Sequence, residues 1–244
     1  MLTLEKDKKY MASLARNAFD ENSRDIQRLL DVWGEFEGLA NEVPQDDDEI
    51  EIPATQIVFL KSIIILLVSY WEAYLEDIAE EALKHIIQKV ENSNKLPKEL
   101  KKEIAKELNN EKDDLAVWKL CGDNWRQLCL KRFDVLTENR NRNFNSPKSH
   151  LTNEFIQKAI GLENITSVWK TNTLNSKECS KRLDDIIALR GAIAHRGNVT
   201  RKITLESVGE DVEFIKKLVA KTGGAINTFV KKTTNIPLWE KSDK

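Results

Sequence analysis

The sequence predicts an all-α helical bundle, and three observations support this fold class. Apolar residues recur at helical spacing, as in the i, i+4, i+7 series of Leu29, Trp33 and Phe36. Charged residues make up 32% of the 244 residues, and nine glycines and five prolines leave little turn-forming chemistry. No segment alternates polar and apolar residues over a length that would build a strand. We therefore expect a single all-α domain over residues 1–244, with long central helices and additional shorter ones.

The N-terminal part is expected to contain the long helices. A long amphipathic helix, or a pair of helices, is predicted over about residues 4–40. The four acidic residues 46–49 lie between Pro44 and Pro53, which indicates a solvated turn or a short linker. Pro53 then begins a second helix that extends to about residue 90, because proline is tolerated in the first turn. The first half of this helix is apolar on all sides, which places it at the centre of the bundle.

Shorter helices are expected in the rest of the chain. Their predicted ranges are about 97–111, 113–121, 124–139, 153–160, 164–172, 176–196 and 205–233. Residues 139–153 are expected to form a polar loop that contains Pro147. Thr204 is a suitable N-cap for the last helix. Gly223-Gly224 marks either a break in that helix or a close contact with another helix.

Composition excludes several classes of site and partner. The net charge of −2 provides no global basic field that would attract nucleic acid, so an anionic ligand needs a local basic patch. Cys121, Cys129 and Cys179 show no Cys-x-x-Cys spacing, and the three histidines are dispersed, so neither a metal site nor a cofactor is expected. Reduced thiols and an N-terminus unlike a signal peptide favour the cytoplasm. The apolar run Ile57–Val68 is interrupted by Lys61 and is too short to cross a bilayer, so no membrane role is expected.

The helix expected at 176–196 carries an arginine and a histidine five positions apart. On a helical wheel Arg190 falls in the middle of an apolar stripe, about 140° from His195. The stripe consists of Leu183, Ile186, Ile187, Ile193 and Ala194. A buried guanidinium is costly without a partner, so Arg190 needs either a core carboxylate or an anionic ligand.

The surroundings of His195 differ from those of Arg190. On the wheel His195 lies beside Asp184, Ala188 and Gly191, which are the small or polar neighbours expected where a cleft opens or another helix approaches. Two copies of this helix related by a two-fold axis could line one groove with two arginines and two histidines. Between Ile186 and Leu205 the sequence has no acidic residue and four basic ones, so the local field is positive.

This pair of side chains permits RNA cleavage without a metal. A neutral imidazole can take the proton of an RNA 2′-hydroxyl, and the alkoxide then attacks the adjacent phosphate. A guanidinium can stabilise the additional charge of the transition state. The structural alternative is that Arg190 pairs with a core carboxylate and that His195 caps or packs against a neighbour.

Three separated stretches carry a family resemblance. The first is Ser69–Asp77, in the central apolar helix. The second begins at Asn145-Ser146-Pro147 and includes Phe155, Gly161–Ile165 and Trp169, and the third joins Leu183–Asp185 to Leu189–Gly197. In order and spacing these stretches resemble the RiboL-PSP-HEPN family of the HEPN superfamily, with a family-matching core at 54–234 that follows an N-terminal helical region at 1–43.

The resemblance implies an all-α HEPN domain that forms a homodimer and acts as a metal-independent endoribonuclease on RNA. Arg190 and His195 match the Arg-x4-6-His motif and are the candidate catalytic pair. Such an enzyme could serve as a toxin or antiphage-defence effector controlled by an antitoxin or another regulatory chain. Many active HEPN nucleases have a polar residue directly after the arginine, where this chain has Gly191. That departure favours the alternative, a non-catalytic HEPN module for RNA or nucleotide binding or for protein assembly.

Further residues are candidates for supporting roles. Glu72 is either a carboxylate partner that orients Arg190 or an exposed surface residue. Arg196 directly follows His195 and is placed to touch phosphate. Arg140 and Arg142 lie in an acid-free stretch that either contacts the RNA backbone or forms an ordinary solvated loop.

Two aromatic residues next to Glu72 are assigned to the core. Trp71 and Tyr74 continue the buried helical pattern, so we expect them to pack in the core and not to stack on bases.

Overall fold

The computed structural model describes residues 12–41, 54–143, 147–196 and 202–240. Over these residues the chain is largely helical and contains no β-strand, so the predicted all-α fold class is confirmed. The α-helices are α1 (Leu14–Asn41), α2 (Ala54–Lys89), α3 (Lys98–Asn110), α4 (Asn124–Asn143), α5 (Ser149–Ile160), α6 (Ser176–Arg196) and α7 (Leu205–Thr234). Three short 3₁₀ helices connect them: η1 (Ser93–Lys95), η2 (Ala116–Leu120) and η3 (Ile165–Val168).

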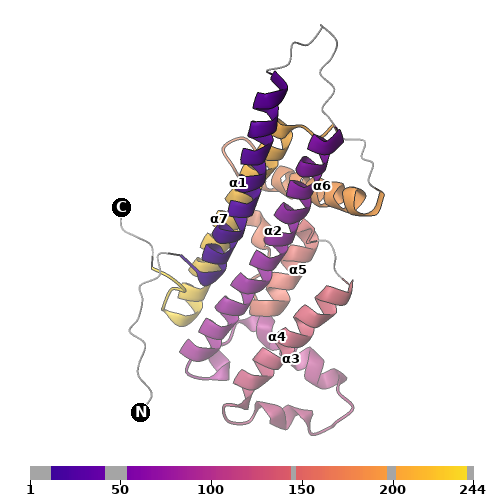
Figure 1. Ribbon diagram of the computed structural model, residues 1–244. Coiled ribbons are helices and arrows are strands. Elements are labelled where there is room, and N and C mark those ends of the chain that lie inside the picture. The colour runs from indigo at the N-terminus through magenta and orange to yellow at the C-terminus, as the bar shows by residue number, and fades with distance from the viewer. Residues whose placement is uncertain (1–11, 42–53, 144–146, 197–201, 241–244) are drawn as a thin grey trace, which may run out of the picture.

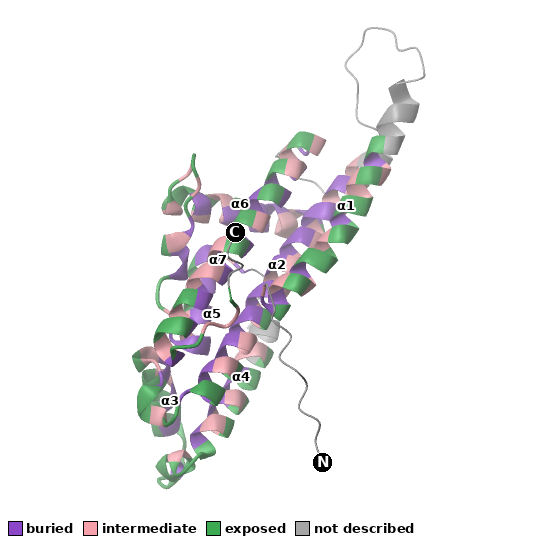
Figure 2. Ribbon diagram, turned by 90° about the vertical axis from the view of Figure 1, so that its left-hand side faces the viewer, coloured by how far each residue is buried: buried purple, intermediate pink, exposed green. Residues whose placement is uncertain are grey.

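Helix α2 is the centre of the bundle. It contacts α1, α4, α5, α6 and α7. In Figure 1 the long helices α1, α2 and α7 run up the molecule, α6 crosses them in the upper half, and α3 lies at the lower end. Figure 2 shows buried residues on the faces that the helices turn toward one another. The apolar first half of α2 therefore occupies the central position that the sequence indicates.

The length of α2 corrects one expectation. Over Ile57–Lys89 the helix is long and apolar enough to cross a membrane, so the argument that its apolar run is too short is wrong on length. The core helix of a soluble protein passes the same test of length and composition. The five helices that pack around α2 give it the surroundings of such a core helix.

Large aromatic side chains tie α2 to the rest of the core. Trp71 and Tyr74 are 0% and 2% exposed, so the prediction that they pack in the core is confirmed. The ring of Trp71 meets the edge of Trp169 at 5.8 Å between centroids, and Tyr74 meets Phe19 of α1 at the same distance. Trp169 Nε1 donates to Thr222 Oγ1 of α7 at 2.9 Å. These contacts connect α1, α2 and α7 with the segment that follows η3.

Helix boundaries agree best with the sequence where they depend on local signals. The helices expected at 97–111, 176–196 and 205–233 agree closely with α3, α6 and α7. Thr204 forms the predicted cap of α7: its side chain accepts from Ser207 N, and Ser207 Oγ accepts from Thr204 N in return. The N-terminal helix is expected from about residue 4, and the part before residue 12 lies outside the described residues.

Two expected helices are only 3₁₀ turns. The segment at 113–121 contains η2, whose bonds connect residues three apart, such as Trp118 N to Leu115 O at 2.9 Å. The segment at 164–172 contains only η3. Asn164 precedes η3 with a left-handed backbone (φ 53°), and Gly122 ends the η2 segment with φ 60°, so neither segment continues as an α-helix.

Gly223 provides a close helix contact. Helix α7 continues without a break through Gly223 and Gly224, which decides between the two predicted alternatives. A Cβ atom built on Gly223 would lie 2.7 Å from the hydroxyl of Tyr74, whereas one built on Gly224 would meet no atom within 4 Å. The Tyr74 hydroxyl is held in place because it donates to Val219 O at 3.0 Å. Only glycine therefore allows α7 and α2 to approach at this point.

Gly223→Ala is expected to destabilise the protein by about 1–3 kcal/mol, because the added methyl group must displace a buried, hydrogen-bonded tyrosine. Gly224→Ala is the matched control and is expected to raise the free energy of unfolding by about 0.5–1 kcal/mol through helix propensity alone. Urea unfolding monitored by circular dichroism measures both values. Equal effects of the two substitutions would contradict the contact.

Candidate functional site

Helix α6 is a rigid platform for the arginine and the histidine. Its start is capped by Asn175, whose Oδ1 accepts from the backbone of Lys177 and Glu178 at 2.9 and 3.1 Å. Glu178 Oε2 accepts from Asn175 N at 2.7 Å and completes a reciprocal cap. The buried residues of α6 lie on one stripe and anchor it to the bundle: Cys179, Leu183, Ile186, Ile187, Leu189 and Ile193.

Arg190 lies within this buried stripe. Its side chain is half buried, and its Nε atom is shielded from solvent. The position within the apolar stripe agrees with the helical wheel, apart from Ala194, which the wheel assigns to the stripe and which is exposed. The last turn of α6 projects to the side of the long helices (Figure 1), which explains why the apolar stripe ends at Ile193.

His195 is exposed on the projecting last turn. Ala188 on the same side of the helix is exposed as well, and Gly191 is half buried. A Cβ atom on Gly191 would meet no atom within 4 Å. The side of α6 that carries His195 therefore presents small residues and open space, as a surface that receives a ligand or a second helix requires.

The helix geometry sets the separation of Arg190 and His195. Five residues of α-helix correspond to about 7.5 Å along the axis and about 140° around it. In one protomer the two side chains therefore leave α6 in different directions. They can converge on one phosphate more readily when two α6 helices approach each other.

Asp184 connects α6 to the start of α5. Its carboxylate accepts from the backbone N of Ser149 at 2.7 Å and from Ser149 Oγ at 3.0 Å. The N-cap residue of α5, Lys148, has no side-chain cap of its own, so a carboxylate from another helix fills that role. Asp184 and His195 are only about 20° apart around the axis of α6, since eleven residues complete about three turns. The start of α5 is therefore held on the side of α6 that carries His195, about 16 Å from that residue along the helix axis.

Asp184→Ala is expected to lower the free energy of unfolding by about 0.5–2 kcal/mol, because the start of α5 loses its carboxylate cap and the charge that complements the helix dipole. The neighbouring Asp185→Ala is the matched control: Asp185 is 61% exposed in a surface ion pair with Lys181 at 2.6 Å. Its effect is expected to stay within about 0.5 kcal/mol. Urea unfolding compares the two, and a control loss as large as that of Asp184→Ala would refute the capping role.

The sequence pattern does not reveal the role of Asp184 and Ser149. On the helical wheel Asp184 is only a neighbour of His195, and the polar loop is expected to continue to residue 153, whereas α5 begins at Ser149. The sequence does contain a signal for the start of α5, because Pro147 ends the preceding segment. Lys148, directly before Ser149, cannot cap a helix with its own side chain, which indicates that a cap must come from elsewhere in the chain.

The structure places the supporting candidates as follows. Glu72 is half buried on α2, which contacts α6, and its pairing with Arg190 stays a prediction. Arg140 and Arg142 are expected in a loop, but α4 continues to Asn143, so their backbone is helical. The side chains of Arg140, Arg142 and Arg196 lie outside the described residues, and their contacts with RNA stay predictions.

The buried thiols are poor candidates for chemistry. Cys129 is buried, and desolvation raises its pKa to about 11, so the thiol stays protonated near neutral pH. Burial also raises the pKa of Cys179. Nucleophilic roles for these two cysteines are therefore disfavoured.

Comparison with known proteins identifies the family of the chain. Neither curated proteins nor solved structures give a match. The family model described as RiboL-PSP-HEPN matches residues 27–228, a range that begins within α1 and ends within α7. This range includes α6 with Arg190 and His195, and α5 with the Ser149 that Asp184 holds. Because the match covers most of the chain, the protein belongs to the RiboL-PSP-HEPN family.

Proposed function

We propose that this protein is a metal-independent endoribonuclease that acts in the cytoplasm as a homodimer, with Arg190 and His195 as its catalytic residues. Family membership supports a HEPN-type nuclease or another RNA-related function. The observation that carries the finer proposal is the exposure of His195 on the same helix that holds Arg190 half buried. In this arrangement the imidazole of His195 is accessible to a substrate, and the half-buried side chain of Arg190 has less conformational freedom than an exposed one.

The proposed reaction is transesterification of the RNA backbone. His195 takes the proton from a ribose 2′-hydroxyl, and the resulting alkoxide forms a new bond to the adjacent phosphorus. The bond from phosphorus to the 5′-oxygen breaks, and that oxygen takes a proton from water, while the exposed His195 returns its proton to the solvent. Arg190 stabilises the charge that accumulates on the phosphoryl oxygens. The products are a 2′,3′-cyclic phosphate and a 5′-hydroxyl end.

A homodimer fits the shape of α6. In each protomer the two side chains leave the helix about 140° apart, whereas a two-fold axis along α6 brings both pairs into one groove. The small residues Ala188 and Gly191 on the His195 side would let the second helix approach closely. Within the segment from Ile186 to Leu205, which lacks acidic residues, the exposed Lys202 adds to the positive field that a phosphate backbone needs.

The purified protein is expected to cleave single-stranded RNA in the presence of EDTA and to leave 2′,3′-cyclic phosphate ends. A matched oligonucleotide with a 2′-deoxyribose at the cleavage position should stay intact, because it lacks the nucleophile. Gel electrophoresis of end-labelled RNA and mass spectrometry of the products identify the ends.

Three outcomes would overturn this proposal. Loss of cleavage in EDTA would point to a metal, and 5′-phosphate ends would point to an attacking water. RNA that is bound without being cut would assign the chain to the non-catalytic alternative that Gly191 favours.

A further inference from the structure

An exposed apolar cluster lies at the lower end of the molecule, far from α6. Leu115, Val117 and Trp118 are 66%, 57% and 65% exposed. The other exposed large apolar residues in the described part of the chain are scattered singly, as is common on protein surfaces. Three within four consecutive residues form a patch of the kind that marks an interaction site.

The backbone that carries these side chains is well fixed. Ala116, between two of the exposed residues, is 2% exposed, and Leu120 packs against the core. Asp113 Oδ1 accepts from Leu115 N at 2.9 Å, and Cys121 N donates to Trp118 O at 3.0 Å. The patch is therefore displayed by an ordered segment and needs little rearrangement to bind.

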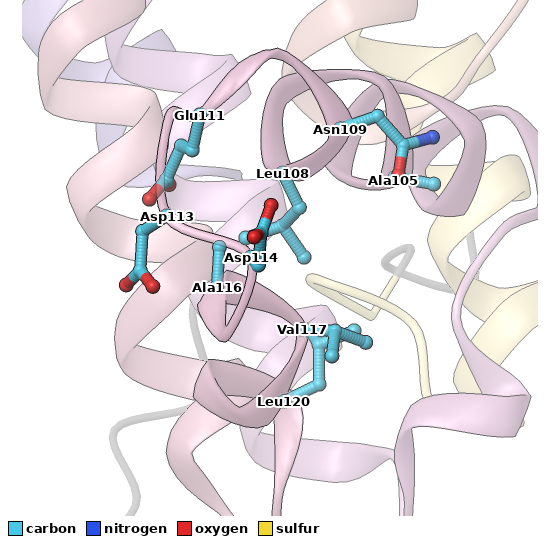
Figure 3. Close-up of a pocket in the computed structure, with 9 residues that line it drawn as sticks. All are labelled: Ala105, Leu108, Asn109, Glu111, Asp113, Asp114, Ala116, Val117 and Leu120. Atoms are coloured by element: carbon cyan, nitrogen blue, oxygen red, sulfur yellow. The ribbon is translucent and has the colours of Figure 1, made fainter.

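A pocket opens beside the patch, between the end of α3 and η2. Its volume is about 290 Å³. The lining residues labelled in Figure 3 include the aliphatic Leu108, Val117 and Leu120. This volume is at the lower end of the range of about 300–1,000 Å³ for ligand pockets, and it is large enough for one or two side chains of a protein partner.

The charge at the edge of the pocket is negative. Glu111, Asp113 and Asp114 line it, and all three are labelled in Figure 3. Glu111 is paired with Lys119. Among the described residues, neither Asp113 nor Asp114 has an ion-pair partner, so both are available to a cation that arrives with a ligand.

We propose that Leu115, Val117, Trp118 and the adjacent pocket, together the η2 surface, form the docking site for a basic amphipathic segment of a partner protein. An aliphatic or aromatic side chain of that segment would enter the pocket, and its lysines or arginines would face Asp113 and Asp114. In Figure 1 the connection between α3 and α4, which contains η2, lies at the opposite end of the molecule from α6. A partner bound there leaves the proposed cleavage site open, so it would recruit or localise the protein without blocking it.

The test uses three synthetic helical peptides of about 15 residues that share one leucine face and carry lysine, glutamate or glutamine on the other. Fluorescence anisotropy of each labelled peptide measures its affinity for the full chain. The lysine peptide is expected to bind, and its affinity should fall at least about ten-fold in Val117→Asp and in Asp114→Lys. Val135→Asp is the matched control, because Val135 is 47% exposed, lies eleven residues past the first residue of α4 and does not line the pocket.

Several results would overturn the proposal. Equal binding of the lysine and glutamate peptides would refute the charge complementarity, and unchanged binding by Val117→Asp would refute the site. Self-association in sedimentation velocity that Val117→Asp abolishes would assign the surface to a second copy of this chain. RNA cleavage by Val117→Asp is expected to equal that of the wild type, so docking and the proposed nuclease function can fail independently.

Discussion

His195→Ala is expected to lower the rate of RNA cleavage by about 10²–10⁴-fold, because it removes the group that takes the 2′-hydroxyl proton. His195 is exposed on the last turn of α6, so its loss should leave the fold and the free energy of unfolding nearly unchanged. Initial rates of cleavage of a fluorophore–quencher RNA in EDTA provide the measurement, with circular dichroism to verify the fold.

The matched control is His150→Ala. His150 is an exposed histidine in the first turn of α5, so the substitution removes the same side chain from a position outside α6. The control should cleave at the wild-type rate. A His195→Ala protein that cleaves as fast as the wild type would exclude the mechanism, and equal losses in both variants would show that neither histidine has a specific role.

Arg190→Met is expected to lower the cleavage rate by about 10²–10³-fold, because the transition state loses a fixed cation. Methionine is chosen because Arg190 lies in the apolar stripe of α6 and its aliphatic stem contributes to packing there. Arg190→Lys keeps the charge and should recover part of the rate, although an ammonium lacks the fork geometry of a guanidinium. Full activity of a folded Arg190→Met protein would leave Arg190 with a structural role only.

The same substitution tests whether the site is shared between subunits. Arg190→Met and His195→Ala proteins should each be inactive as homodimers. After they are mixed and allowed to exchange subunits, about half of the dimers combine one intact arginine with one intact histidine. Recovery of cleavage in the mixture would support a shared site, and an inactive mixture with demonstrated exchange would refute it.

Local sequence signals predict the helices that carry and surround the candidate site. The apolar stripe of α6 follows from 3.6-residue periodicity, so the sequence alone assigns Arg190 to the stripe and His195 to another side of the helix. The predicted cap at Thr204 and the proline signal at Pro53 are likewise properties of neighbouring residues, and they predict helix starts close to those of α7 at Leu205 and α2 at Ala54. Predictions of this kind hold because they need no information about distant parts of the chain.

Other features depend on contacts between segments far apart in sequence. The start of α5 at Ser149 is capped by Asp184, 35 residues away, and no local pattern could predict that contact. The requirement for glycine at position 223, and not at position 224, arises from the Tyr74 hydroxyl of another helix. The exposure of Ala194 reflects how far α6 extends past the bundle, which periodicity alone does not specify.

By itself, the sequence determined the helical class and the order of the main helices, and it identified the pair of residues that we propose for RNA cleavage. These depend on side-chain periodicity and short-range capping, which act within a few residues. Only the tertiary structure decided that Asp184 holds α5 against α6, that Gly223 is a helix contact and that η2 displays an apolar surface. Those features depend on how helices that are far apart in sequence pack against one another. Local periodicity and capping carry no information about such packing.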